Sequence, residues 1–127
     1  MSIGFAASCA AVLFTSVLYG CGSDSVSSSR GEQLPTVRVI SADNAYEPRD
    51  ISVAVGQSIE WTNIGNNLHD IRIKKGPSNF GIDDKAFEPL TGTYSYAFKK
   101  TGMFVYYCTI HGTASGKGMA GTIKVTD

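Results

Sequence analysis

The sequence predicts an all-β domain, a sandwich or barrel of about seven to eight short strands. Apolar residues alternate with polar ones along many short segments, which is the spacing of half-buried strands. Glycine and proline residues interrupt these segments at the places where turns are expected. After residue 34, no stretch of ten or more residues shows the 3.6-residue apolar spacing of an amphipathic helix.

Length and charge indicate a single domain with no affinity for nucleic acid. The chain has 127 residues, with 11 basic and 11 acidic side chains, and the first charged residue is Asp24. The part that follows is about 100 residues long, which suits one domain and leaves no room for a second core. Balanced charge without a basic run provides no electrostatic surface for nucleic acid.

The N-terminal segment has the composition of an export signal. Residues 3–19 are apolar or small, and LYGC at residues 18–21 resembles the bacterial lipoprotein cleavage box, in which Cys21 would carry lipid. We therefore predict a lipoprotein-like signal peptide over residues 1–20, export to the periplasm or cell envelope, and a membrane tether through Cys21. An ordinary signal peptide and an uncleaved anchor are the alternatives.

The signal is followed by a tether and then by the folded domain. Residues 21–34 are polar and Ser-rich, which predicts a flexible segment. Residues 35–127 then form the domain, which we expect to be monomeric. Cys108 is the only cysteine of this domain, so no internal disulfide can form within it. An unpaired cysteine in an exported protein is either a metal ligand or a buried, inert thiol.

The expected strands follow one another at short intervals along residues 35–127. Gly56 and Gln57 predict a turn between two of them. Residues 79–90 are the least strand-like part and predict either a short helix or a covering loop. The alternating residues that define the strands are Val37 and Val39; Ile51, Val53 and Val55; Ile59 and Trp61; Ile71 and Ile73; Tyr94, Tyr96 and Phe98; Phe104, Tyr106 and Cys108; and Ile123 and Val125.

Four side chains with metal-binding chemistry are placed at strand ends. Cys108 and His111 are three residues apart at the end of one strand, and a Gly-rich loop over residues 112–118 leads from them to Met119. His69 stands at the start of a different strand, which a sandwich can place alongside the first. Two His, one Cys and a weaker Met are the ligands of a mononuclear blue-copper site. With only two histidines, the chain cannot build multinuclear copper sites.

Around these residues the sequence resembles the cupredoxin family, most of all the small plastocyanin-like proteins of bacterial envelopes. The resemblance covers about residues 37–126. It is carried by YEP at residues 46–48, ISVAVGQSIEWTN at 51–63, GMFVYYCTIH at 102–111 and GMAGTIKV at 118–125. It implies a Greek-key β-sandwich that binds one copper ion through His69, Cys108, His111 and Met119.

The resemblance also implies a function. A type 1 copper site transfers single electrons by cycling between Cu(I) and Cu(II) without binding a substrate, so the chain is expected not to be an enzyme. Its partners would be redox proteins that dock transiently near Ile110 and residues 112–118, where His111 reaches the surface in the family. Copper carriage or delivery is the alternative function, and a zinc site of Cys108, His69 and His111 is chemically allowed.

Three residues near the expected site have more than one interpretation. Seven residues separate His111 from Met119, more than in many plastocyanins, so Met119 is either the axial ligand or a packing residue. Met103 has the opposite strand parity to Cys108 and is a poorer candidate. Asp70, where the family often has Asn, either accepts a hydrogen bond from Thr109 or lies exposed. Tyr107 is either a surface for electron transfer or an ordinary strand residue.

Overall fold

The computed structural model describes residues 31–127, and Gly31–Asp127 form one compact unit. The signal peptide predicted over residues 1–20, the lipid on Cys21 and the tether up to residue 30 lie outside the described residues. Among residues 31–127, no helix is long and apolar enough to cross a membrane. The start of the domain at residue 35 stays a prediction.

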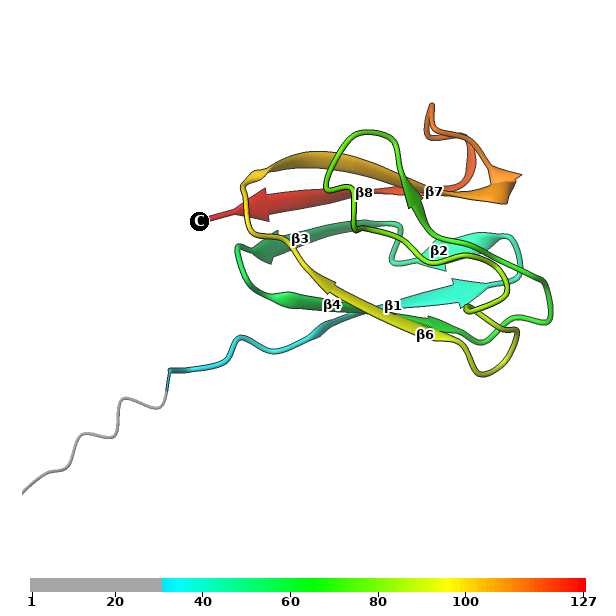
Figure 1. The fold of residues 1–127 in the computed structure, drawn as a ribbon, viewed down its shortest axis with the longest axis horizontal. Coiled ribbons are helices and arrows are strands. Elements are labelled where there is room, and N and C mark those ends of the chain that lie inside the picture. Colours follow the sequence, from blue (N-terminus) through cyan, green and yellow to red (C-terminus); the bar gives the residue numbers. More distant parts are fainter. Residues whose placement is uncertain (1–30) are drawn as a thin grey trace, which may run out of the picture. The chain divides into compact units, whose positions relative to one another are not determined.

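Eight strands form two four-stranded sheets packed face to face, which confirms the predicted all-β fold (Figure 1). One sheet has the order β2-β1-β4-β6 and the other the order β3-β8-β7-β5. The strands are β1 (Val37–Ala42), β2 (Ala45–Glu47), β3 (Asp50–Ala54), β4 (Ser58–Asn63), β5 (Arg72–Ile73), β6 (Thr93–Ala97), β7 (Gly102–Gly112) and β8 (Gly118–Thr126).

One strand differs from the prediction, and the structure of residues 79–90 decides between the two predicted alternatives. The three-residue strand β2 was not predicted, because it is too short to show alternation before Pro48 interrupts the chain. Residues 79–90 contain turns and one isolated bridge and no helix, so the covering-loop alternative is confirmed. Phe80 and Phe87 of this loop are buried and extend the core.

The core lies between the sheets and combines Val and Ile side chains with a cluster of aromatic rings. Trp61 of β4 is fully buried and its ring lies 5.6 to 5.7 Å from those of Phe80, Tyr94 and Tyr106. Each large side chain removed from water stabilises the fold by roughly 1.5–3 kcal/mol. The strand alternation seen in the sequence corresponds to inward and outward faces: along β4, buried residues alternate with half-buried ones.

The sandwich has two ends, which we call the ligand pole and the opposite pole. At the ligand pole β4 ends at Asn63 and β7 reaches Cys108. At the opposite pole the Gly56 amide donates to the Phe98 carbonyl at 2.9 Å, joining the turns that follow β3 and β6. The two poles lie at the right and left of Figure 1, and the chain ends at the left.

Strand β7 continues past Cys108 into a hairpin at the ligand pole. Its register with β8 shifts between Tyr107 and Gly112, and pairing then resumes at Gly112 and Gly118. Gly118 has a φ of 67°, and a Cβ there would lie 2.4 Å from the His111 carbonyl oxygen, so this position requires glycine. The Gly-rich segment after His111 is thus a closed hairpin.

Candidate metal centre

His69 is delivered by the loop between β4 and β5, and Asn63 holds that loop in place. The Asn63 side chain is fully buried. Its amide nitrogen donates to the Phe87 carbonyl at 3.1 Å, and its amide oxygen accepts from the Gly65 N–H at 3.2 Å. Because a buried amide is stabilised by such directional bonds, the loop that carries His69 has a fixed path.

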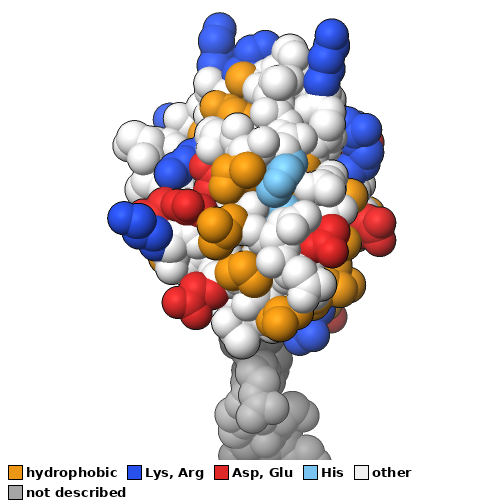
Figure 2. Space-filling view, turned by 90° about the vertical axis from the view of Figure 1, so that its right-hand side faces the viewer, with side chains coloured by type: hydrophobic (Ala, Val, Ile, Leu, Met, Phe, Trp, Pro, Cys, Tyr) orange, Lys and Arg blue, Asp and Glu red, His pale blue; other side chains and the backbone are white. Residues whose placement is uncertain are grey.

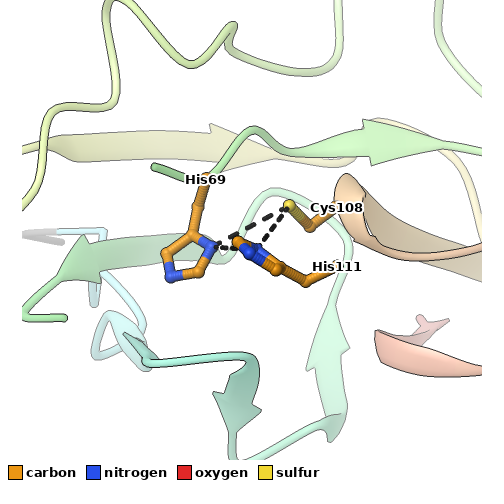
Figure 3. Close-up of side chains that lie close together, drawn as sticks. All are labelled: His69, Cys108 and His111. Atoms are coloured by element: carbon orange, nitrogen blue, oxygen red, sulfur yellow. Dashed lines mark hydrogen bonds between the residues drawn. The ribbon is translucent and has the colours of Figure 1, made fainter. Parts of the chain in front are cut away.

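Three of the four predicted ligands meet at the ligand pole (Figure 3). The Cys108 Sγ atom lies 3.9 Å from His69 Nδ1 and 4.0 Å from His111 Nδ1, and the two Nδ1 atoms are 3.2 Å apart. His69 and Cys108 are fully buried, whereas His111 is partly exposed. The three-residue spacing of Cys108 and His111 thus brings two donors together, and the third, His69, comes from the loop before β5 rather than from the start of a strand as expected.

The three donor atoms fit a single metal ion. Nitrogen and sulfur ligands lie about 2.0 to 2.3 Å from a bound ion, so ligands around one ion stand roughly 3 to 4 Å apart. The three observed separations fall in that range. A thiolate with two imidazoles suits copper, and the same set is found around zinc.

Burial favours the uncharged forms of two of these side chains in the absence of metal. Burial raises the pKa of the Cys108 thiol, opposed by backbone hydrogen bonds and reinforced slightly by the charge of Asp70. Burial, and then the neighbouring His111, lower the pKa of His69. Since the thiolate is the form that binds metal, metal binding releases the thiol proton.

Asp70 is buried and hydrogen-bonded, so its predicted bond with Thr109 is confirmed and the exposed alternative is wrong. The Thr109 backbone N–H donates to Asp70 Oδ1 at 2.6 Å, and the Thr109 hydroxyl donates to Oδ2 at 2.7 Å. Arg72 also donates to Oδ2, through Nε at 3.2 Å. Arg72, two residues further on the expected strand, was not predicted to take part in the site.

Met119 is fully buried near the start of β8, in the same core cluster as Cys108. Met103 is 67% exposed, which agrees with its parity opposite to that of Cys108. Met119 as the axial ligand stays a prediction, and so does the electron-transfer role of Tyr107.

Apolar side chains lie beside His111 at the surface. Figure 2 looks onto the ligand pole and shows a histidine at the surface beside apolar side chains. This histidine is His111, since His69 is fully buried. We define the apolar patch as four side chains that are 49 to 61% exposed, namely Ile64, Leu68, Leu90 and Ile110. Of these four residues, only Ile110 was predicted from the sequence; the signal for the others was the presence of apolar residues within polar loops.

Comparison with known proteins identifies the family. Residues 35–126 match the family described as copper binding proteins, plastocyanin/azurin family. Amicyanin-alpha of Methylorubrum extorquens is 26% identical over 119 residues, covering 91% of this chain and 95% of that protein. Chloroplastic plastocyanin of Physcomitrium patens is 31% identical over 99 residues, covering 72% of this chain and 57% of that one.

Solved structures share the fold. A reduced amicyanin variant has a TM-score of 0.58 at 24% identity, over 72% of this chain and 82% of that one. A mutant fern plastocyanin has a TM-score of 0.57 at 22% identity, over 71% of this chain and all of that one. The copper nitrite reductase of Thermus scotoductus has a TM-score of 0.57 at 24% identity, over 73% of this chain and 23% of that one. With its eight-strand sandwich and its clustered sulfur and nitrogen donors, the chain belongs to the plastocyanin/azurin family of copper-binding proteins, and its metal is copper.

Proposed function

We propose that this chain is a type 1 copper protein that transfers single electrons between redox proteins of the cell envelope. The convergence of His69 Nδ1, Cys108 Sγ and His111 Nδ1, in a chain of a copper-binding family, is the observation that carries the proposal. A bound copper ion supplies the one-electron couple between Cu(I) and Cu(II). We assign His69, Cys108 and His111 as its ligands, with Met119 as the weak axial fourth.

Burial of the donors supports electron transfer over catalysis. His69 and Cys108 have no exposed surface, so a substrate has no approach to the site from their side. The two sheets and the hydrogen bonds of Asn63 and Asp70 hold the donor atoms in place before metal arrives. Little rearrangement should then accompany the gain or loss of one electron.

The exposed part of His111 supports the proposed route of the electron. It lies at the ligand pole, where the apolar patch provides a surface for docking (Figure 2). A reduced partner would give one electron to the oxidised site, and an oxidised partner would later take it. Partners that must leave quickly use small interfaces, and the patch has only four large apolar side chains.

The optical spectrum of the purified, copper-loaded chain tests this function. We expect an intense visible band from thiolate-to-copper charge transfer that disappears on reduction and returns on oxidation. A colourless copper protein that cannot be oxidised would contradict electron transfer and favour copper carriage. Exchange of copper with a chelator should be slow for an electron carrier and fast for a delivery protein.

We further propose that the domain is exported, monomeric and tethered to the membrane through lipid on Cys21. The support is the LYGC box at residues 18–21 and the position of Pro35, whose carbonyl accepts from Gln57 Nε2 at 2.8 Å. Gln57 belongs to the turn at the opposite pole. Pro35, the first residue of the predicted domain, is therefore held at the pole opposite to the metal donors.

Fractionation of bacterial cells tests the location. Full-length protein should sediment with membranes and enter solution only with detergent, because several acyl chains together anchor firmly. Cys21→Ala should abolish lipid labelling without changing the visible spectrum. A wild-type protein that is soluble without detergent would contradict the tether and leave electron transfer untouched.

A further inference from the structure

A carboxylate lies in the link between the two ligand segments. Asp70 directly follows His69, and Thr109 directly follows Cys108, so the two hydrogen bonds from Thr109 to Asp70 join the neighbours of two ligands. The Tyr46 hydroxyl also donates to the Asp70 backbone carbonyl at 2.7 Å, which fixes the backbone. Asp70 therefore has a defined position close to the site.

The geometry of this link does not by itself require a charge. An asparagine would accept the Thr109 N–H through its oxygen and donate from its nitrogen to the Thr109 hydroxyl, whose hydrogen can rotate away. The carboxylate adds a negative charge, and Asp70 is only 4% exposed. A buried charge is costly unless it is paired and hydrogen-bonded.

Arg72 is the pairing group. Its Nε atom lies 3.2 Å from Asp70 Oδ2. The Arg72 side chain is 42% exposed, compared with 6% for the side chain of Asp70 taken without its backbone. Arg72 belongs to β5, and in the sheet it stands opposite Tyr107, the residue before Cys108. The guanidinium group thus meets solvent on one side and the buried carboxylate on the other.

We propose that Asp70 and Arg72 are positioning residues that act as a compensated charge pair, with Asp70 lowering and Arg72 raising the reduction potential of the copper site. This inference rests on the proposed electron-transfer function. A negative charge beside the thiolate favours Cu(II), the more positive oxidation state, and so lowers the potential. Arg72 offsets that charge, and because the Asp70 side chain is almost completely buried, salt screens its charge less than that of a surface carboxylate.

Three variants test the pair through the sign of the change in potential. In Asp70→Asn the tie to Thr109 remains and the negative charge is lost, so the potential should rise. In Arg72→Met the carboxylate is left uncompensated, so the potential should fall. The double variant Asp70→Asn/Arg72→Met removes both charges and should lie between the two single variants, close to wild type. Lys74→Met removes an exposed charge two residues beyond Arg72 and should leave the potential unchanged.

A second readout separates charge from geometry. Amide exchange of Thr109 in the copper-free protein should stay slow in Asp70→Asn, where the bond persists, and become faster in Asp70→Ala, where it is lost. Copper-free Asp70→Ala should also unfold at a lower temperature than Asp70→Asn. Equal exchange rates in the two variants would contradict the tie.

The outcomes distinguish this inference from the proposed function. If wild-type protein lacks the charge-transfer band, the proposed function fails before any variant is compared. If the band is present but Asp70→Asn and Arg72→Met leave the potential unchanged, or shift it in the same direction, the charge pair is overturned. If the Asp70 variants do not fold, Arg72→Met alone tests the charge pair. The Arg72 side chain is partly exposed, and removing it leaves the bonds between Thr109 and Asp70 in place.

Discussion

The two poles of this sandwich are held together by different kinds of interaction. At the ligand pole, buried polar side chains join loops and strands, with Asn63 bonded to Phe87 and Gly65 and with Asp70 bonded to Thr109. At the opposite pole, the Phe98 and Phe104 rings stack with centroids 4.6 Å apart. There the turns are joined by backbone hydrogen bonds, and the Gln57 side chain bonds to Ala54 and Pro35 in part-buried or exposed positions rather than in the core.

The difference follows from what each pole must do. Apolar packing is non-directional, so it stabilises the fold without fixing any one atom in relation to another. Hydrogen bonds are directional and hold donor atoms within the narrow distances that a metal requires. The opposite pole can therefore contribute stability alone, whereas the ligand pole must also contribute geometry. Four substitutions test this division.

Cys108→Ser should have the largest effect, the complete loss of the intense visible band. A hydroxyl is a poor replacement for the soft thiolate, so the charge-transfer transition disappears even where some copper remains bound. The absorption spectrum and the copper content are the measurements, with circular dichroism as the check on folding. Persistence of the band would overturn the ligand assignment.

Phe98→Ala should have the largest effect on stability and none on the site. Phe98 is fully buried and its ring contacts those of Phe80, Tyr96 and Phe104, so we expect a loss of about 3–5 kcal/mol in the free energy of unfolding. Denaturant unfolding of the copper-free protein measures this loss. Phe98→Leu is the control and should lose less. A changed visible spectrum in the folded Phe98→Ala protein would show that the poles are coupled.

Asn63→Ala should lower the free energy of unfolding less than Phe98→Ala does, and should disturb the metal site more. It leaves the buried Phe87 carbonyl without its bond to Asn63, a loss of about 1–3 kcal/mol for a buried group without a partner, whereas the Gly65 N–H keeps its bond to the Ser41 carbonyl. Because the loop to His69 loses its anchor, the visible band should also shift or broaden. Asn67→Ala removes a half-buried amide from the same loop, which donates only a long bond of 3.4 Å to Asn44 Oδ1, and this control should leave both stability and the visible band unchanged. An unchanged band in Asn63→Ala would contradict its role in placing His69.

Met119→Leu should have the smallest effect, a rise in reduction potential with copper and colour retained. Removing a weak axial sulfur disfavours Cu(II) more than Cu(I), while the buried position keeps an apolar side chain of similar volume. Voltammetry measures the shift. Met103→Leu is the matched control, since Met103 is 67% exposed, and it should match wild type. If both variants match wild type, Met119 is a packing residue.

Local patterns in the sequence were enough to predict much of this molecule. Alternation located every strand except β2, because a strand places successive side chains on opposite faces. The closeness of Cys108 and His111 follows from a separation of only three residues. The turn at Gly56 was also evident, and its φ of 81° explains the glycine. Such features depend on neighbours along the chain, which the sequence contains directly.

Other features were decided only when distant segments met. His69 lies 39 residues before Cys108, and its Nδ1 atom reaches the site because the loop after β4 crosses to the second sheet. The bond between Asp70 and Thr109 depended on the same crossing of the loop. The pairing of β5 with β7 then placed Arg72 beside the Asp70 carboxylate. The apolar patch likewise gathers side chains from separate loops. Composition and spacing along one segment carry no information about which other segment will face it, so these contacts were fixed by the packing of the two sheets.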